Sequence, residues 1–319
     1  MRKLYPLTFH PILKEKIWGG QKLKTLLGKE LGTIKNCGES WEVSAIPGSV
    51  SVVKNGELAG KKLTELIEEY GNLLLGKTVV EKYGKNFPLL IKFIDAQEDL
   101  SIQVHPNDEL AQQRHGCLGK TEMWYVLQAD ENASLIAGFC QKLTKEKYLQ
   151  VLQHGALMDV LKIHTVKADD AFYIPAGRVH TIGKGILLAE VQQSSDITYR
   201  IYDFDRVDDK GNKRELHTDL ALDALNFDDT EATKIEATDG KIIENAYFSV
   251  TKQVVVKTTW HLSQQDAFVI CMFVDGNGQI AYQEQSWQVS RGQTFLIPSN
   301  MAINISTEST LSFLIIKPS

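Results

Sequence analysis

Several absences narrow the class of protein that this sequence can encode. No window approaches the roughly 18 consecutive apolar residues of a membrane-spanning helix. The N-terminal stretch meets Pro6 and Pro11 before any long apolar run develops, which argues against a secretory signal peptide. The four cysteines are scattered without a CxxC pair, so they form neither a disulfide framework nor a zinc–thiolate site. The net charge of -5 gives no reason to expect nucleic acid or an anionic membrane surface as a partner. We therefore expect a cytoplasmic protein, in which His, carboxylate or amide groups would have to hold any metal ion.

The pattern of the chain predicts a mainly β protein with three helical insertions. A length of 319 residues suits two domains or one large one. Apolar residues recur at helical spacing, or follow helix-start signals, in only a few segments, so we place helical insertions at about 61–85, 106–118 and 142–163. Most of the remaining chain is typical of short strands separated by turns. The charged span 228–241 is expected to be a linker.

An internal similarity indicates that the chain contains two related β-modules. AFYIPAGRVHTI (171–182) aligns with TFLIPSNMAINI (294–305), which matches His180 with Ile303. Upstream, EMWYVLQADENASLIAG (122–138) resembles DAFVICMFVDGNGQIAY (266–282), which matches Glu122 with Asp266. Any two hairpins that end in a proline turn look alike, but here both halves match in the same order, and the insertion at 142–163 accounts for their different spacing. We therefore predict two domains related by repetition, at 1–235 and 236–319.

The polar positions that can carry chemistry belong to the first module. In LSIQVHPND (100–108), side chains alternate along a predicted strand, so Gln103 and His105 share the face opposite the apolar residues. Glu122 lies on a second predicted strand, and His180 follows a proline turn. Two imidazoles, a carboxylate and an amide oxygen suit a divalent cation with open positions for water or substrate. A single His in a sheet is more often an ordinary hydrogen-bonded residue, so the prediction depends on the combination and on its absence from the second module.

Three long motifs resemble the class I mannose-6-phosphate isomerases, in the short form found in bacteria. They are SIQVHPND, GKTEMWYV and IPAGRVHTIGKGILLAEVQQSSDITYRIYDFDR, and the similarity extends to KIWGG, GESWEVS and FPLLIKFIDAQEDLSIQVHP. The resemblance runs along most of the chain. It implies two cupin-like modules, each a double-stranded β-helix or jelly roll, with the helical insertions in the first. One departure is Asp169, which stands where cupins usually carry glycine.

The resemblance also implies an activity, a cofactor and a set of site residues. The activity is the interconversion of mannose 6-phosphate and fructose 6-phosphate through a cis-enediol(ate), and the partner is therefore a small sugar phosphate. Nothing in the sequence demands more than a monomer. One Zn²⁺ per chain is expected, with Gln103 either on the ion or beside its ligands. The implied metal site is Gln103, His105, Glu122 and His180, the implied substrate-binding residues are Lys92, Ser101 and Glu190, and the implied catalytic residues are Arg200 and Lys120.

Arg200 has a structural alternative to a catalytic role. It lies in ITYRIYDFDR, where alternation places it on one face with Thr198 and Tyr202. It either reaches the substrate and steadies the enediolate, or it forms a structural ion pair with Asp203 or Asp205.

Three further charged residues and three tryptophans allow two interpretations each. Lys120 shares a strand face with Glu122, so it either points toward the cation or is a solvated lysine at a strand edge. Lys92 and Glu190 both lie inside apolar strands, where an unpaired charge is expensive. They either neutralise each other, or one of them serves as the proton-transfer base. We expect core packing, rather than contact with a sugar, for the three tryptophans near these motifs, Trp18, Trp41 and Trp124.

Two other functions fit part of the pattern. His105, Glu122 and His180 could form the two-His-one-carboxylate triad of a non-haem iron bicupin dioxygenase. The additional Gln103 and the surrounding cations argue against an oxygenase for uncharged substrates, and oxygen uptake with bound iron would favour it. The other alternative is a non-catalytic sugar-binding cupin. Such a protein should have lost its metal ligands, as the second module has, so a metal assay separates the two.

Overall fold

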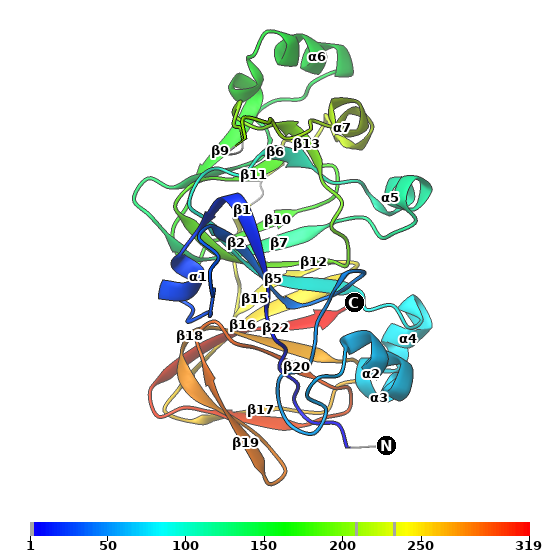
Figure 1. Ribbon diagram of the computed structural model, residues 1–319, viewed down its shortest axis with the longest axis vertical. Coiled ribbons are helices and arrows are strands. Elements are labelled where there is room, and N and C mark those ends of the chain that lie inside the picture. The colour runs from blue at the N-terminus through cyan, green and yellow to red at the C-terminus, as the bar shows by residue number, and fades with distance from the viewer. Residues whose placement is uncertain (1–2, 208–209, 232–233) are drawn as a thin grey trace.

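Two β-structures are stacked along the long axis of the molecule (Figure 1). The computed structural model describes residues 3–207, 210–231 and 234–319. The first β-structure ends with β14 (Lys234–Ile235), and the second begins with β15 (Lys241–Glu244). The expected mainly β architecture of two modules is therefore confirmed.

A seven-stranded sheet forms the base of the first module. Its strand order is β1-β2-β5-β12-β7-β10-β14. All residues of β5 and β12 are buried, because these central strands pack on both faces. The other bounds in this sheet are Ile12–Gly20 (β1), Cys37–Val43 (β2), Leu89–Ala96 (β5), Ile186–Gln193 (β12), Glu122–Ala129 (β7) and Ala171–Ile174 (β10).

A five-stranded sheet packs against one face of the seven-stranded sheet. One apolar cluster joins them, with Trp124 and Leu188 from the larger sheet and Leu135 and Ile182 from the smaller. The order of the smaller sheet is β13-β6-β11-β8-β9. Its bounds are Tyr199–Tyr202 (β13), Ile102–Val104 (β6), His180–Ile182 (β11), Ser134–Phe139 (β8) and Leu161–Thr165 (β9), and a small hairpin elsewhere pairs Ala45–Ile46 (β3) with Ser49–Val50 (β4).

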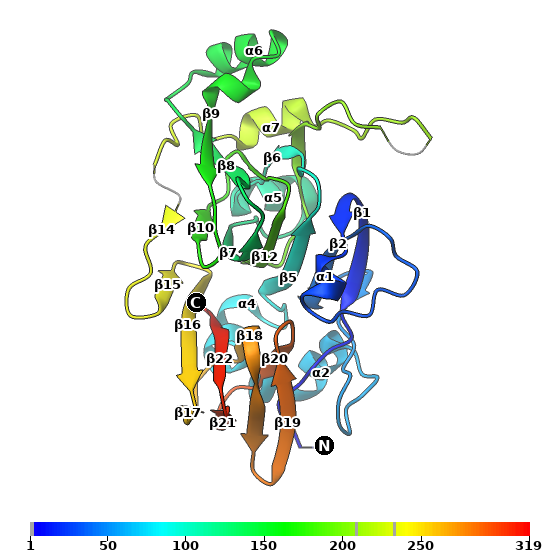
Figure 2. The same ribbon diagram turned by 90° about the vertical axis from the view of Figure 1, so that its left-hand side faces the viewer.

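The second module is an eight-stranded sheet around its own apolar cluster, which includes Phe273, Phe295 and Phe313. The order is β15-β16-β22-β18-β21-β17, with β19 and β20 also paired to β18. Figure 2 shows these strands below the first module. Their bounds are Phe248–Val256 (β16), Thr310–Pro318 (β22), Val269–Tyr282 (β18), Ile303–Ser306 (β21), Thr259–Leu262 (β17), Gln285–Ser290 (β19) and Thr294–Ile297 (β20).

Strand pairing supports the internal repeat and corrects one part of its alignment. In the first module β10 pairs with β7, and β11 pairs with β8 and β6. In the second module β20 pairs with β18, and β21 pairs with β18 and β17. Ile174 faces Glu122 in the first module, and its equivalent Ile297 faces Val269 in the second. The match of Glu122 with Asp266 is therefore wrong, because Val269 holds the equivalent position in the sheet.

Helices lie within the three segments where the sequence predicts them. Asn107 and Thr144 cap two of these helices by accepting hydrogen bonds from backbone N–H groups of the first turn. The helices are α2 (Leu63–Tyr70), α3 (Asn72–Leu75) and α4 (Lys77–Tyr83), then α5 (Asp108–His115), then α6 (Lys145–Gln153) with the short 3-10 helix η1 (Leu157–Val160). None of the helices in the described ranges is both long and apolar enough to span a membrane.

Two short helices, α1 (Lys22–Thr25) and α7 (Thr218–Ala224), are not predicted by the sequence pattern. Each is too short to give a clear helical period. Tertiary contacts stabilise α7, since Ala221 is fully buried in an apolar cluster of the first module.

The span 228–241 is more ordered than a linker, which corrects that expectation. Strand β14 pairs with β10, and Arg178 holds the buried Asp229 through two hydrogen bonds of 2.5 and 2.6 Å. Residues 232 and 233 lie outside the described residues. The division into domains at 1–235 and 236–319 stays a prediction, because the largest apolar cluster takes residues from both sides of it. Phe87 and Phe268, for example, stack there with ring centroids 4.8 Å apart.

Asp169, at the position of the usual cupin glycine, links the two modules. Its φ of 73° lies in the left-handed region, which Asp tolerates better than most residues. Its carboxylate accepts a hydrogen bond from the Tyr125 hydroxyl and lies 2.9 Å from Nζ of Lys252 on β16. Asp169 therefore adopts a backbone conformation that glycine would adopt more easily, and its side chain forms an ion pair between the modules.

Candidate metal centre

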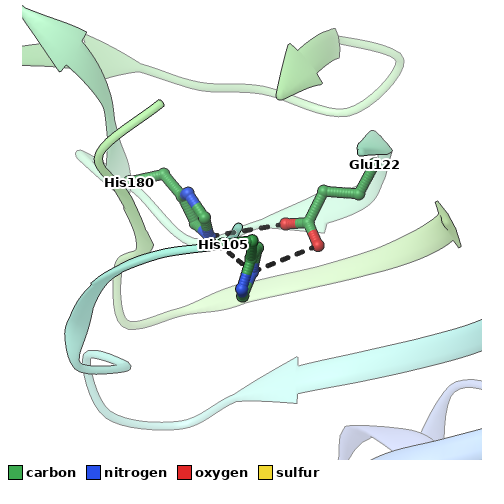
Figure 3. Close-up of side chains that lie close together, drawn as sticks. All are labelled: His105, Glu122 and His180. Carbon is green, nitrogen blue, oxygen red and sulfur yellow. Dashed lines mark hydrogen bonds and ion pairs between the residues drawn. The ribbon is translucent and has the colours of Figure 1, made fainter. Parts of the chain in front are cut away.

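Three buried side chains from three strands converge at one point of the first module (Figure 3). His105 follows β6, Glu122 begins β7, and His180 begins β11. The two Nε2 atoms lie 3.1 Å apart, and each lies 3.5 Å from an oxygen of Glu122. The candidate ligand atoms all lie within 4.8 Å of one another. The structure thus brings together residues that are distant in the sequence.

Backbone carbonyls fix how both imidazoles are oriented. His105 donates from Nδ1 to the carbonyl of Ile197 over 2.9 Å, and His180 donates from Nδ1 to the carbonyl of Arg178 over 2.8 Å. With the proton on Nδ1, each ring presents the lone pair of Nε2 toward Glu122. Burial, Lys120 and the neighbouring His180 hold the pKa of His105 well below its ordinary value, and burial lowers the pKa of His180 to about 3. Both rings are therefore neutral at pH 7, as a metal ligand must be.

The carboxylate of Glu122 is the least satisfied group of the centre. Both of its oxygens are buried, and neither has a hydrogen-bond partner among the described residues. Burial and the charge of Glu190 raise the pKa of Glu122 to about 7. Two lone pairs and a buried carboxylate that face one point are unfavourable unless a cation lies between them. The donor set therefore fits a divalent metal ion.

Gln103 lies next to this centre. Its amide nitrogen is 3.2 Å from Nε2 of His180, and Ser101 donates to its carbonyl oxygen over 3.4 Å. The strand register explains the contact, since Gln103 and His180 face each other across β6 and β11.

Lys120 points toward the candidate ligands, and it is buried rather than solvated. Its Nζ lies 3.0 Å from Nε2 of His105 and 3.3 Å from Oε2 of Glu122. Lys120 therefore supplies positive charge at the centre itself.

Lys92 and Glu190 contact each other directly. Lys92 Nζ lies 2.9 Å from Oε1 of Glu190, across neighbouring positions of β5 and β12, and both residues are buried. The indole N–H of Trp124 donates to the other oxygen of Glu190 over 3.1 Å. Burial alone would lower the pKa of Lys92, but Glu190 and Glu39 more than offset this and raise it. Lys92 thus stays charged. Its direct contact with Glu190 supports the interpretation that the two residues neutralise each other.

Arg200 lines a cavity and does not form either of the expected ion pairs. In the described part of the chain, Asp203 pairs with Arg206 and Arg214, and Asp205 pairs with Lys213. Arg200 instead donates to the carbonyl of Glu215 over 2.7 Å, and its buried Nε has no hydrogen-bond partner among the residues that the structure describes.

Burial along this strand follows the predicted alternation, since Thr198, Arg200 and Tyr202 are half-buried whereas Tyr199 and Ile201 between them are buried. Thr198 and Arg200 line the cavity. A register shift lies between Arg200 and Tyr202 in the pairing of β13 with β6.

The cavity beside the candidate ligands has a volume of about 250 Å³. The predicted residues Lys92, Ser101, Lys120 and Glu190 line it together with Gln103, Arg200 and Ile182. Trp18, Trp41 and Trp124 are all buried in apolar clusters, as core packing predicts, and Trp18 and Trp41 also line the cavity. Sequence reasoning does not single out five further charged residues of the wall, Lys14, Lys16, Glu39, Asp196 and Arg214. The alternation of side chains along β1 and β2 is the pattern that could have identified Lys14, Lys16 and Glu39.

The positions of the second module that are equivalent to Gln103, Glu122 and His180 are apolar. Leu262 faces Ile303 there, as Gln103 faces His180 in the first module, and Val269 replaces Glu122. All three belong to one buried apolar cluster. The candidate metal centre is therefore a property of the first module.

Comparison with known proteins identifies the family. The model of the type I phosphomannose isomerase catalytic domain matches residues 7–134, and that of the mannose-6-phosphate isomerase cupin domain matches residues 238–315. The mannose-6-phosphate isomerase of Streptococcus mutans is 37% identical over 301 residues, which are 93% of this chain and 93% of the relative. The mannose-6-phosphate isomerase ManA of Bacillus subtilis is 38% identical over 307 residues, 92% of this chain and 93% of the relative. The crystal structure of the Bacillus subtilis mannose 6-phosphate isomerase superposes with a TM-score of 0.87 at 33% identity, covering 98% of this chain and 99% of that one. These similarities span both cupin-like modules, and this chain belongs to the type I phosphomannose isomerase family.

Proposed function

We propose that this protein interconverts mannose 6-phosphate and fructose 6-phosphate, with one Zn²⁺ per chain. The observation that carries the proposal is the convergence of His105, Glu122 and His180 beside a cavity rich in cations. The named relatives at 37% and 38% identity carry the corresponding activity in their names.

The cation would be held by His105, Glu122 and His180, with Gln103 as a fourth ligand or as a hydrogen-bond donor to His180. Nitrogen and oxygen ligands without a thiolate suit zinc, which has no redox chemistry of its own. When bound, such an ion supplies Lewis-acid stabilisation of the negative charge that develops on the sugar oxygens.

The reaction moves one proton between C1 and C2 of the sugar and another between O1 and O2 through a cis-enediol(ate), and it needs no co-substrate. Negative charge develops on the sugar oxygens during this reaction, and two cationic side chains of the protein can stabilise it. The Lys120 ammonium lies at the ligand end of the cavity, and the Arg200 guanidinium brings an unpartnered N–H to its wall. We assign catalytic roles to both.

Substrate binding is assigned to Lys92, Ser101 and Glu190. Lys92 and Glu190 form a neutral buried pair at the wall, so they offer polar groups to sugar hydroxyls without adding net charge. The Ser101 hydroxyl lies beside Gln103 and lines the same space. A phosphate dianion needs cations, and Lys14 lines the same cavity.

We further propose a cytoplasmic monomer as the working form. Free cysteines are stable in a reducing compartment, and two of the four in this chain are not buried.

A coupled isomerase assay before and after chelation tests the proposal. Purified protein should convert mannose 6-phosphate to fructose 6-phosphate, lose that activity on complete metal removal, and regain it with Zn²⁺. Variants His180→Ala and His164→Ala form a matched pair, since His164 lies on β9 outside the candidate ligand set. Only His180→Ala should abolish metal binding. Turnover that survives complete metal removal would refute the mechanism, and oxygen uptake with bound iron would point to a dioxygenase instead.

A further inference from the structure

A second and larger cavity, of about 1000 Å³, lies between the two modules. On one side are the N-terminal segment and the loop after α1, and on the other are β19, β20 and the turn between them. Figures 1 and 2 both show α1 above this part of the second module. The cavity is separate from the candidate metal centre and has none of its ligands in the wall.

The wall of this inter-module cavity contains cations that the protein does not neutralise. Lys29 is paired with the buried Glu42 over 2.6 Å. In the described ranges, neither Lys54 nor Arg291 forms an ion pair, although both line the cavity. The Nε of Arg291 is also buried without a hydrogen-bond partner. A guanidinium in this state is expensive unless an anion satisfies it.

Other polar and aromatic groups of the wall fit the remainder of a small organic molecule. Thr294 is 6% exposed, and its buried hydroxyl has no partner among the described residues. Trp287 is half-buried, and Tyr5 supports its indole ring from one side at 6.1 Å between centroids. The side-chain amides of Asn277 and Gln288 line the same space. A volume of this size accommodates an ordinary metabolite.

Strands β1 and β2 separate the two cavities and contribute to both. On β2, Glu39 and Trp41 line the catalytic cavity, whereas Glu42 lines the inter-module cavity. On β1, Lys14 lines the catalytic cavity and Leu13 the other. Side chains alternate along a strand, so an occupant of one cavity contacts the same strands that shape the other.

We propose that the inter-module cavity is a second ligand site, which binds an organic phosphate and modulates the catalytic cavity through β2. Lys54 and Arg291 receive the phosphate, and Trp287 packs against the ring to which the phosphate is attached. Nucleotides and sugar phosphates share this chemistry. Any effect on catalysis is a coupling free energy between the two sites and therefore acts in both directions.

Calorimetric titration of the metal-loaded protein tests the site. ADP serves as the probe for nucleotides and glucose 6-phosphate as the probe for sugar phosphates. Pyrophosphate and adenosine each represent only part of such a ligand. At least one of the first two should bind more tightly than either partial ligand. Arg291→Gln and Lys54→Ala should each weaken that binding about 10- to 100-fold, as expected for a lost charge-assisted hydrogen bond. Thr294→Val, which keeps the shape of the side chain, should weaken it less.

Two control variants locate the binding. Lys147→Ala removes an exposed cation from α6, far from this cavity, and should change nothing. Arg200→Ala removes a cation of the catalytic cavity and should leave the binding of ADP intact, whereas glucose 6-phosphate resembles the proposed substrate and is also expected to bind in the catalytic cavity. ADP binding that Arg200→Ala abolishes and Arg291→Gln retains would place the probe in the catalytic cavity and overturn the proposal. The absence of binding by every probe would also overturn it, and the cavity would then be a solvent-filled cleft.

The coupling has its own readout. The probe that binds should change KM or kcat of the isomerase reaction in the wild-type protein, and this change should disappear in Arg291→Gln. Binding without any kinetic change would overturn the coupling through β2.

Discussion

Replacing Glu190 by glutamine tests whether the buried pair with Lys92 is required for the fold. The side chains of the pair are 6% and 4% exposed, and 2.9 Å separates Lys92 Nζ from Glu190 Oε1. Glutamine retains one oxygen that can accept from Trp124, and its NH2 group then replaces the oxygen that accepts from Lys92, so the substitution removes both the charge and the hydrogen bond of the pair. Breaking a buried pair in this way costs about 3–5 kcal/mol of unfolding free energy. Glu39 also acts on Lys92, so we expect the lower end of the range, about 3 kcal/mol.

The chain offers a matched control for this measurement. Lys77 and Glu81 form an exposed pair one helical turn apart, with side chains 79% and 64% exposed and 3.7 Å between the charged atoms. Glu81→Gln should cost no more than about 1 kcal/mol. Urea unfolding of both variants at pH 7 gives the two values under one set of conditions. If Glu190→Gln costs no more than Glu81→Gln, the argument from burial is refuted.

A double variant then separates the structural role of the pair from its proposed role in substrate binding. Lys92→Met together with Glu190→Gln removes both charges, so it should recover much of the stability that Glu190→Gln loses. If turnover returns with stability, the pair acts only through the fold. If the double variant is stable and inactive, the pair contributes to the reaction directly.

The other predictions concern Arg200, the second module and acid stability. If Arg200 has the proposed catalytic role, Arg200→Ala should lower kcat by about 10²–10³-fold, as expected for the loss of one charge-stabilising donor, with circular dichroism and bound metal unchanged; an unfolded variant would favour a structural role. Ile303→Ala should cost about 2–5 kcal/mol in urea unfolding, because Ile303 is 2% exposed, and should leave kcat/KM unchanged. Burial would raise the pKa of Glu39, but Lys92 and Lys16 outweigh it and lower that pKa to about 2. This contribution to stability is present above pH 4.5, the unfolded value, and is lost as the pH falls toward 2, so Glu39→Gln should flatten the stability profile in that window.

The sequence predicts the modules and the metal centre because both depend on features with a clear pattern. Strand alternation alone places Gln103 and His105 on one face, and the proline turn repeats at equivalent points of the two modules. The long motifs indicate the family, and the resemblance to that family indicates which other residues join Gln103 and His105 at the site. The convergence itself follows from the pairing of β6 with β11, which brings His180 opposite Gln103.

What the sequence does not predict depends on irregular or long-range geometry. The register shift after Arg200 in the pairing of β13 with β6 is not marked by any local composition. Helix α7 has seven residues and forms because the fold offers Ala221 a buried site. Sequence similarity matches Glu122 with Asp266, whereas the pairing of the strands matches it with Val269, three residues further along the chain.

Once Glu122 is matched with Val269, there is a physical reason why candidate metal ligands in the first module occupy positions that are apolar in the second. In the second module Leu262, Val269 and Ile303 occupy the positions of Gln103, Glu122 and His180, and all three belong to one buried apolar cluster. In the first module the carboxylate of Glu122 has no hydrogen-bond partner among the described residues, and the Nε2 atoms of the two imidazoles lie 3.1 Å apart. Lys120 offsets part of this cost, since its Nζ lies 3.3 Å from Oε2 of Glu122 and 3.0 Å from Nε2 of His105. A bound cation would offset the remainder, because the carboxylate and both imidazoles would share it. We infer that an ion would take, in the first module, the place that Val269 and Ile303 fill with apolar contact in the second.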